Sequence, residues 1–188
     1  MTDQIPVQMR LEWTPNPNTI KYMVNRTLVE RGAANFSEKA EAEKAPLPGK
    51  LFAINGVTGI MIGRNFVTVT KTEGADWEEV HNHASETIQA HLEAEESILG
   101  EYELFLESSK EASSQEEAII RRILENEIRP AVARDGGDIT FERYEQGVLY
   151  LSMKGSCSGC PSSTMTLKMG IEARLRDELP DLVEVVAI

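Results

Sequence analysis

The feature that most limits the fold is a polar stretch at residues 107–117, which reads ESSKEASSQEE. Apart from Ala112 it contains only Ser, Glu, Lys and Gln, so it cannot contribute to a hydrophobic core. It divides the 188 residues into a first part at 1–106 and a second part at 118–188, each the size of a small domain. The sequence therefore predicts two small domains joined by a linker.

The first part mixes strand and helix patterns. Residues 57–62 and 66–70 are β-branched and aromatic runs separated by a short Gly-containing turn, which predicts a hairpin. Residues 7–13 alternate loosely and predict a further strand, while 47–54 have helical character. Asp76 is a suitable N-cap for a helix running to about residue 94.

Two segments of the first part are harder to place. The loop Thr14–Asn18 holds two prolines and two asparagines, and Asn18 is expected to cap a short helical turn through Lys21. This loop fits a rigid turn and a partner contact equally well. Residues 37–46 fit an exposed helical turn or a loop.

The second part has a clearer order of elements. Ser114 and Glu117 have the spacing of a capping box, and the helix that follows is expected to kink or end near Pro130. Next come a DGGD turn at 135–138, a hairpin of strands 139–144 and 148–153, a loop, a helix from Pro161, and a closing strand at 182–188. The order α-β-β-α-β predicts an α+β fold whose C-terminal unit is a three-stranded sheet with helices on one face.

Composition excludes several classes of protein. The formal net charge of −12 argues against a phosphate-backbone binder, so no nucleic-acid partner is expected. No apolar run approaches the roughly 18 residues needed to cross a bilayer, so no membrane association is expected. The N-terminus lacks the pattern of a signal or transit peptide. We therefore expect a cytoplasmic protein of bacterial type, or a mitochondrial matrix protein whose transit peptide has been removed.

The chain contains two cysteines, Cys157 and Cys160, and they lie three residues apart. Two thiolates at this spacing can bind one metal from a single tight loop, and Gly159 between them permits a close approach of the backbone. Pro161 is expected to start a helix, which places both sulfurs near free N–H groups and the positive end of the helix dipole. This location favours the thiolate, which is the metal-binding form.

The cysteine pair alone leaves three possibilities open: an iron–sulfur cluster, a redox dithiol, and a zinc-bridged interaction module. A cluster takes about four thiolates, so its simplest completion is two chains related by a two-fold axis. The three histidines lie in the first part of the chain and are not expected to be ligands; they are His81, His83 and His91. The cysteine loop is expected to be exposed, with the core elsewhere.

Several other side chains are expected to be structural. Met165 and Met169 have helical spacing and are predicted to pack inside the fold. Trp13 and Trp77 are predicted to be buried or half-buried.

A longer pattern surrounds the cysteines. The DGGD turn at 135–138 and the run GSCSGCPSSTMTLK at 155–168 resemble the C-terminal domain of NifU-type iron–sulfur scaffold proteins, over residues 119–186. The first part resembles the companion domain of Nfu proteins from bacteria and mitochondria, through TPNPN at 14–18, KLFAI at 50–54, Gly56 and Val57, and NFVTVTK at 65–71. The resemblance thus covers nearly the whole chain.

The resemblance implies a scaffold or carrier rather than an enzyme, with no catalytic residue. It implies that Cys157 and Cys160 bind a [4Fe–4S] cluster between two subunits and that the cluster passes to apo iron–sulfur client proteins, after upstream assembly proteins have supplied it. Apo protein is expected to be largely monomeric and cluster-loaded protein to be a homodimer. The alternatives, a thiol–disulfide oxidoreductase or a zinc-bridged module, would use the same two cysteines.

Overall fold

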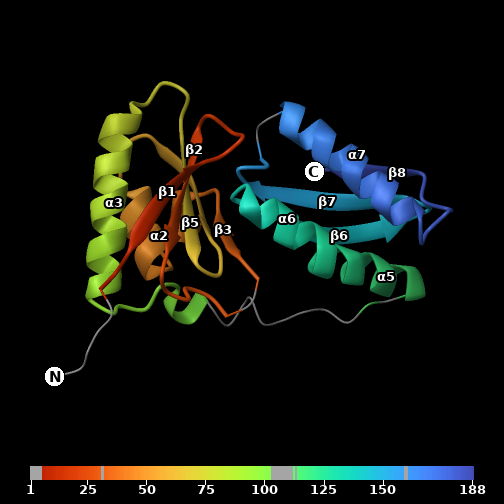
Figure 1. Ribbon diagram of the computed structural model, residues 1–188, viewed down its shortest axis with the longest axis horizontal. Coiled ribbons are helices and arrows are strands. Elements are labelled where there is room, and N and C mark those ends of the chain that lie inside the picture. Colours follow the sequence, from red (N-terminus) through yellow and green to blue (C-terminus); the bar gives the residue numbers. More distant parts are fainter. Residues whose placement is uncertain (1–5, 31, 103–111, 113, 159–160) are drawn as a thin grey trace. The chain divides into compact units, whose positions relative to one another are not determined.

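The computed structural model describes residues 6–30, 32–102, 112, 114–158 and 161–188. The chain forms two compact units, Met1–Ser108 and Ser109–Ile188 (Figure 1). Most of the predicted linker at 107–117 lies outside the described ranges, so its position stays a prediction. None of the helices within those ranges is both long and apolar enough to span a bilayer.

The N-terminal unit is built on a five-stranded antiparallel sheet in the order β1-β2-β5-β4-β3. The central strands β2 and β5 supply much of the core, because their alternating apolar residues Ile20, Tyr22, Val67 and Val69 are buried under the helices. The strands are β1 (Met9–Trp13), β2 (Thr19–Val24), β3 (Ala34–Phe36), β4 (Val57–Ile62) and β5 (Phe66–Lys71).

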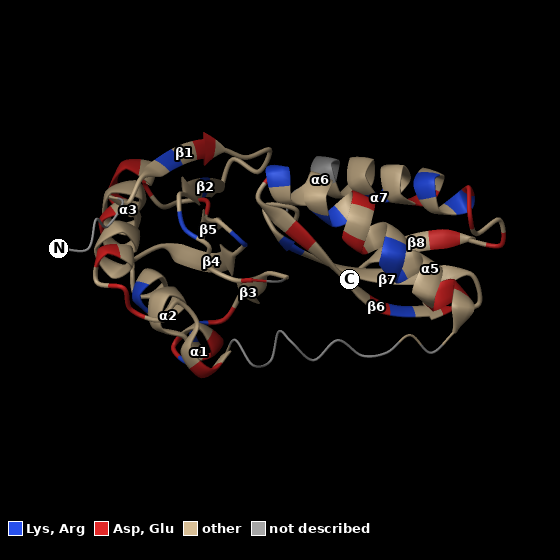
Figure 2. Cartoon of the chain, turned by 60° about the horizontal axis from the view of Figure 1, so that its bottom comes forward, with Lys and Arg blue, Asp and Glu red and all other residues tan. Residues whose placement is uncertain are grey.

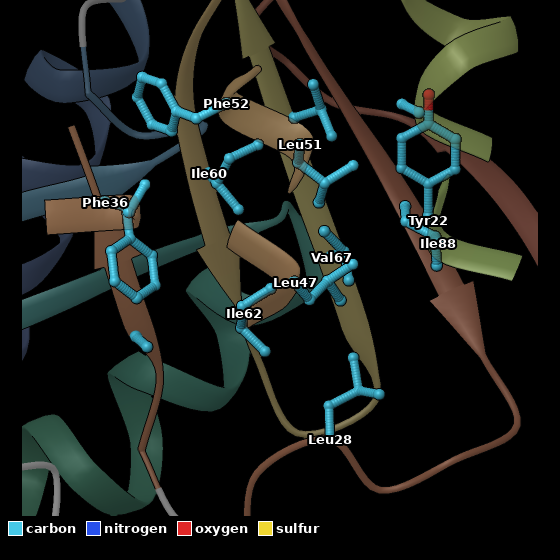
Figure 3. Close-up of a cluster of buried hydrophobic side chains, with 14 of the residues drawn as sticks. Tyr22, Leu28, Phe36, Leu47, Leu51, Phe52, Ile60, Ile62, Val67 and Ile88 are labelled. Atoms are coloured by element: carbon cyan, nitrogen blue, oxygen red, sulfur yellow. The ribbon is translucent and has the colours of Figure 1, made fainter. Parts of the chain in front are cut away.

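Helices cover this sheet and close its core. Figure 3 shows Leu47 and Leu51 of α2 lying over β4 and β5, with Ile88 of α3 close to Tyr22. Burying aliphatic side chains in this way is the main source of stability for the unit. The helices are α1 (Lys39–Ala42), α2 (Pro46–Phe52), α3 (Trp77–Glu93) and the 3₁₀ turn η1 (Gly100–Tyr102).

Several local predictions for this unit are confirmed. The hairpin is formed by β4 and β5, and α3 begins after Asp76, whose carboxylate accepts a hydrogen bond from the Glu78 N–H at 2.7 Å. The prediction for Asn18 is wrong, because the chain enters β2 at Thr19 instead of a helical turn. Residues 19–24 alternate in a way that suits a strand between two partners, and pairing with β1 and β5 decides the outcome. Strand β3 was not predicted.

The loop Thr14–Asn18 is a rigid turn between β1 and β2. The Thr14 hydroxyl donates to the Thr19 carbonyl at 2.9 Å, and the Asn18 N–H donates to Asn16 Oδ1 at 2.9 Å. The Trp77 Nε1–H donates to the Pro17 carbonyl at 3.0 Å, which ties the turn to the first turn of α3. Trp77 is half-buried as predicted, whereas Trp13 is 70% exposed, so its predicted burial is wrong.

The C-terminal unit has the predicted α-β-β-α-β order and confirms the α+β fold. Its sheet has the order β6-β7-β8, in which β6 and β7 form an antiparallel hairpin and β7 and β8 are parallel. The helices lie on one face of this sheet (Figures 1 and 2). The elements are α5 (Gln115–Ile123), η2 (Leu124–Ile128), α6 (Arg129–Arg134), β6 (Gly137–Glu145), β7 (Val148–Gly155), α7 (Pro161–Arg176) and β8 (Glu184–Ala187).

The first helix of this unit begins and bends as its sequence predicts. The Ser114 hydroxyl accepts a hydrogen bond from the Glu117 N–H at 3.1 Å and so caps α5. Pro130 has no N–H, and its ring would clash with the carbonyl four residues earlier in a regular helix. The five residues before Arg129 form a π-helical segment, η2, which relieves this conflict and joins α5 to α6.

The core of the C-terminal unit lies between the helices and the sheet. Ile120 and Ile123 of α5, together with Ile171 and Leu175 of α7, are fully buried against Leu149. Ile171 and Leu175 thus lie on the inward face of α7. The predicted packing of Met165 and Met169 is wrong, since both side chains are exposed on the opposite face of α7.

Candidate metal centre

Cys157 lies in the short loop between the end of β7 and the start of α7. Cys157 is buried, with 7% of its surface exposed, and it belongs to the core of the C-terminal unit. Cys160, the second predicted ligand, lies outside the described residues. The structure therefore places one of the two predicted cysteines and leaves the other as a prediction from sequence.

The DGGD turn at 135–138 is hydrogen-bonded to the residue directly before Cys157. Gly136 adopts a positive φ of 75°, which glycine tolerates and other residues rarely do. Its carbonyl accepts a hydrogen bond from the Ser156 N–H at 3.1 Å, and the Ser156 hydroxyl donates to the Asp135 carbonyl. Ser156 is itself buried. These bonds fix the residue directly before Cys157 onto the turn.

Gly137 is the point of closest approach between the turn and the cysteine. A Cβ atom built on Gly137 would lie 2.3 Å from the Cys157 Sγ and 3.1 Å from the Cys157 Cβ. It would also lie 3.1 Å from the Val132 Cγ1. Only glycine leaves room for the thiol here, so the backbone of β6 forms one wall of the space that the sulfur occupies.

An ion pair holds the far side of the same turn. The Arg129 guanidinium donates two hydrogen bonds to the Asp138 carboxylate, at 2.7 and 2.8 Å, and a third to Glu125 at 2.6 Å. The hydrogen bonds to Asp138 raise the pKa of Arg129 above its already high value. Asp138 is buried, so this bidentate pair replaces the water that the carboxylate loses. The pair joins α6 to β6 and so braces the turn under Cys157.

The loop also carries its own hydrogen bonds. The Ser158 hydroxyl and its N–H both contact the Gly155 carbonyl, at 2.8 and 3.1 Å. The Thr164 hydroxyl, in the first turn of α7, donates to the Cys157 carbonyl at 3.3 Å. As predicted, α7 begins at Pro161, directly after the second cysteine, which brings the positive end of a 16-residue helix to the loop.

The expectation of a wholly exposed loop is wrong for Cys157. The residue packs against Gly137 and Val132 because β7 leads it back over the turn at the start of β6. Ser158, one residue further, is exposed. The loop thus has a buried base at Cys157 and an exposed edge at Ser158.

The histidines have structural partners within the N-terminal unit. His81 stacks on Tyr22, with its Nδ1 3.1 Å from the Tyr22 hydroxyl. The buried His91 contacts the Lys50 ammonium at 3.2 Å and the Ser97 carbonyl at 3.1 Å. Burial lowers the pKa of His91, with a further contribution from the positive charge of Lys50. Both side chains therefore have hydrogen-bond partners inside the N-terminal unit.

Sequence reasoning missed the roles of Gly137 and Arg129. The DGGD pattern was interpreted only as a turn, although two adjacent glycines already suggest both a special φ and a close approach. No local signal points from Arg129 to Asp138, which lie nine residues apart on different elements. Among the described residues no group of three or more His, Cys, Asp or Glu side chains is arranged to hold a metal ion.

Comparison with known proteins connects this geometry to a family. Residues 9–95 match the family model described as scaffold protein Nfu/NifU N terminal, and residues 120–186 match the NifU-like domain. The chain is 35% identical over 170 residues to the human protein named NFU1 iron-sulfur cluster scaffold homolog, mitochondrial, covering 90% of this chain and 67% of that protein. The chain belongs to the Nfu family of NifU-like proteins. The resemblance seen in the sequence is therefore confirmed.

Two further Nfu relatives show the same extent of similarity. A NifU-like protein of Schizosaccharomyces pombe is 33% identical over 189 residues, covering 97% of this chain and 73% of that protein. The mitochondrial NifU-like protein 5 of Arabidopsis thaliana is 36% identical, covering 86% of this chain and 61% of that protein. The similarity includes both units, although the chain spans less than two thirds of the Arabidopsis relative.

Proposed function

We propose that this chain is an iron–sulfur cluster carrier, in which two copies hold one [4Fe–4S] cluster through Cys157 and Cys160 of each copy and pass it to apo-proteins. The chain would act as a scaffold without catalytic turnover. The observation that carries the proposal is that the two cysteines of the chain are three residues apart in the sequence of a NifU-like unit, and that hydrogen bonds brace the loop at Cys157. Relatives named as cluster scaffolds support the same role.

The chemistry of the loop fits a transferable cargo. Two thiolates per chain bind a cluster, and about four are needed, so the second pair has to come from another chain. A cluster shared in this way is bound by ligands from two surfaces. It can leave when thiolates of an apo-protein replace one pair after the other.

The base of the loop explains how a labile site keeps its shape. Ser156 and the turn below it are linked by hydrogen bonds, and the Arg129–Asp138 pair holds that turn in place. The loop can therefore release its cargo without losing the fold around Cys157. Such preorganisation favours repeated loading and release.

The test is anaerobic reconstitution of the full chain with iron and sulfide. We expect about four iron and four sulfide per two chains, and a mass corresponding to a dimer. Cys157→Ser and Cys160→Ser should each abolish stable cluster binding, because a hydroxyl is a poor iron ligand. Ser152→Ala, which removes a hydroxyl from β7 outside the cysteine loop, is the control and should load normally. A single cysteine variant that kept a full cluster would refute the ligand assignment.

The same experiment separates the alternatives. Two iron and two sulfide per dimer would indicate a [2Fe–2S] cargo. Zinc in the isolated protein, with no uptake of iron, would indicate the zinc-bridged module. A colourless monomer that reduces protein disulfides would favour the oxidoreductase.

Delivery is the proposed task of the N-terminal unit, which has no cysteine. Its acidic surface and the rigid Thr14–Asn18 turn suit recognition of a client or of an upstream assembly protein. Transfer to an apo-client such as apo-aconitase should therefore be slower from residues 118–188 alone than from the full chain. Equal transfer rates to several clients would count against this role.

A further inference from the structure

Helix α7 exposes an apolar face that the core does not use. Met165 is 66% exposed and Met169 is 65% exposed, although methionine is a residue that usually packs inside proteins. Thr166, Gly170 and Ala173 are exposed on the same side of the helix, because residues three to five apart share a face. We call Met165, Thr166, Met169, Gly170 and Ala173 the methionine face.

Three charged residues of α7 lie to either side of this face, and Arg176 lies beyond its C-terminal end, where the guanidinium donates to the Val183 carbonyl at 3.0 Å. On one side the Lys168 ammonium contacts Glu184 of β8 at 2.7 Å, and Glu172 accepts a hydrogen bond from the Val185 N–H at 2.9 Å. On the other side Arg174 pairs with Glu127 of η2 at 2.7 Å. None of the five residues of the methionine face between them carries a charge.

An ordinary solvated helix of this protein looks different. Helix α3 has nearly the same length as α7, and its exposed positions are polar except for Ala90. They are Glu78, Glu79, Asn82, His83, Glu86, Gln89, Ala90 and Glu93. In a chain with 27% charged residues, an uncharged and exposed face of two methionines indicates a surface that is covered in the working state.

We propose that the methionine face is the contact between two copies of this chain when they share a cluster. The inference rests on the proposed function and extends it by naming the surface that joins the two copies. Helix α7 begins directly after Cys160, so its first turns must lie next to whatever supplies the remaining thiolates. Since one chain has two cysteines, that partner is a second copy with its own α7.

The size of the face accounts for a dimer that depends on its cargo. A stable interface buries about 800 Å² and some 20 residues on each side, far more than one helix face of two methionines and three small residues. The face therefore guides and completes the contact, while the cluster supplies most of the binding free energy. Small residues at Gly170 and Ala173 permit a close approach of the two helices, as methionine adapts to the partner surface.

The first experiment compares Met169→Glu with Val183→Glu in reconstituted full chain. Val183 is 63% exposed in the same unit, so the control makes the same change at a surface of equal exposure. Two glutamates facing each other across a two-fold axis repel, so Met169→Glu should lose at least about tenfold in bound iron and run as a monomer. Val183→Glu should load and dimerise like wild type. A Met169→Glu protein that loads and dimerises like Val183→Glu overturns the proposal.

Mixing provides a check that misfolding cannot imitate. Met169→Glu and Met169→Lys protein, each defective alone, should recover cluster loading when mixed, because opposite charges then meet across the contact. The recovered species should be a heterodimer by mass. Absence of recovery from two folded variants also counts against the contact.

A second experiment works without any cluster. In a Cys157→Ser/Cys160→Ser chain, Met169→Cys and Val183→Cys are compared at high protein concentration with a short bis-maleimide cross-linker. Residue 169 should give at least about ten times more covalent dimer than residue 183. Equal yields at residues 169 and 183 overturn the proposed contact, and this outcome does not depend on whether the wild-type chain binds a cluster. If wild type took up no cluster but residue 169 still cross-linked selectively, the proposed function would fail and the contact would stand.

Discussion

Replacing Gly137 by alanine tests how closely the turn and the cysteine loop are coupled. The added methyl group would lie 2.3 Å from the Cys157 Sγ, whereas ordinary contacts begin at 3.4 Å. The sulfur would have to move by roughly 1 Å, and Val132 would have to shift by a few tenths of an ångström. The substitution therefore forces the thiol out of its present position.

The size of the effect follows from the cost of overpacking the core. Inserting a methyl group into a packed core typically costs about 1–3 kcal/mol. If the clash is relieved by turning the Cys157 side chain to a poorer rotamer, that change costs about 0.5–1.5 kcal/mol. This rotamer cost is included in the overpacking cost. We therefore expect Gly137→Ala to lower the free energy of unfolding of the C-terminal unit by about 1–3 kcal/mol.

The chain offers an internal reference for this measurement. Both tryptophans, Trp13 and Trp77, lie in the N-terminal unit, so their fluorescence reports the unfolding of that unit. Circular dichroism reports both units. In urea, Gly137→Ala should leave the fluorescence transition unchanged and shift the dichroism of the C-terminal unit to lower denaturant.

A matched control makes the same chemical change where space is open. A Cβ atom on Gly170 meets nothing within 4 Å, and this residue lies inside α7. Gly170→Ala should therefore raise the stability of the unit by about 0.5–1 kcal/mol, the opposite sign. In a Cys160→Ser background, Gly137→Ala should also make Cys157 react faster with a thiol reagent. Unchanged stability together with unchanged reactivity would refute the close packing of Gly137 on Cys157.

Three further predictions concern single groups. Ser114→Ala should destabilise the C-terminal unit by about 1 kcal/mol because α5 loses its cap, while Ser114→Asp should retain most of it. The buried Thr68 hydroxyl has no hydrogen-bond partner in the described structure, so Thr68→Val should stabilise the N-terminal unit by about 1 kcal/mol. Thr19→Val, which removes a 2.8 Å contact with Thr70, should do the opposite. Because burial lowers the pKa of His91 in the folded state, the unfolded chain binds the proton more readily. The N-terminal unit therefore has its full stability from neutral His91 above the ordinary histidine pKa of about 6.5. Its free energy of unfolding falls as the pH drops below that value.

Each of these predictions has a direct measurement. Urea unfolding followed by dichroism tests Ser114→Ala, and tryptophan fluorescence tests the two threonine variants. Fluorescence transitions at pH 7.5 and 5.5 test His91, and His91→Gln should reduce the difference between the two pH values. A wild-type N-terminal unit that was more stable at pH 5.5 than at 7.5 would contradict the sign worked out for His91.

The sequence by itself determined the local features of this protein. The capping side chains of Ser114 and Asp76, the two hairpins, the bend before Pro130 and the helix starting at Pro161 follow from short-range rules about hydrogen bonds and backbone angles. The cysteine spacing and its flanking residues also pointed to the Nfu family. All of these depend on residues close together in the chain, which is why the pattern alone was sufficient.

Only the tertiary structure decided which surfaces are covered. Residues 19–24 form a strand instead of a capped turn because β1 and β5 pair with them. The local sequence pattern does not reveal either pairing. Helical spacing placed Met165 and Met169 on one face of the helix, but it did not show whether that face is buried or exposed. In the structure the opposite face of α7 packs against the sheet. Cys157 is buried because β6 and β7 bring Gly137 against it from 20 residues away. Burial depends on what packs over a residue, and that is a property of long-range contacts.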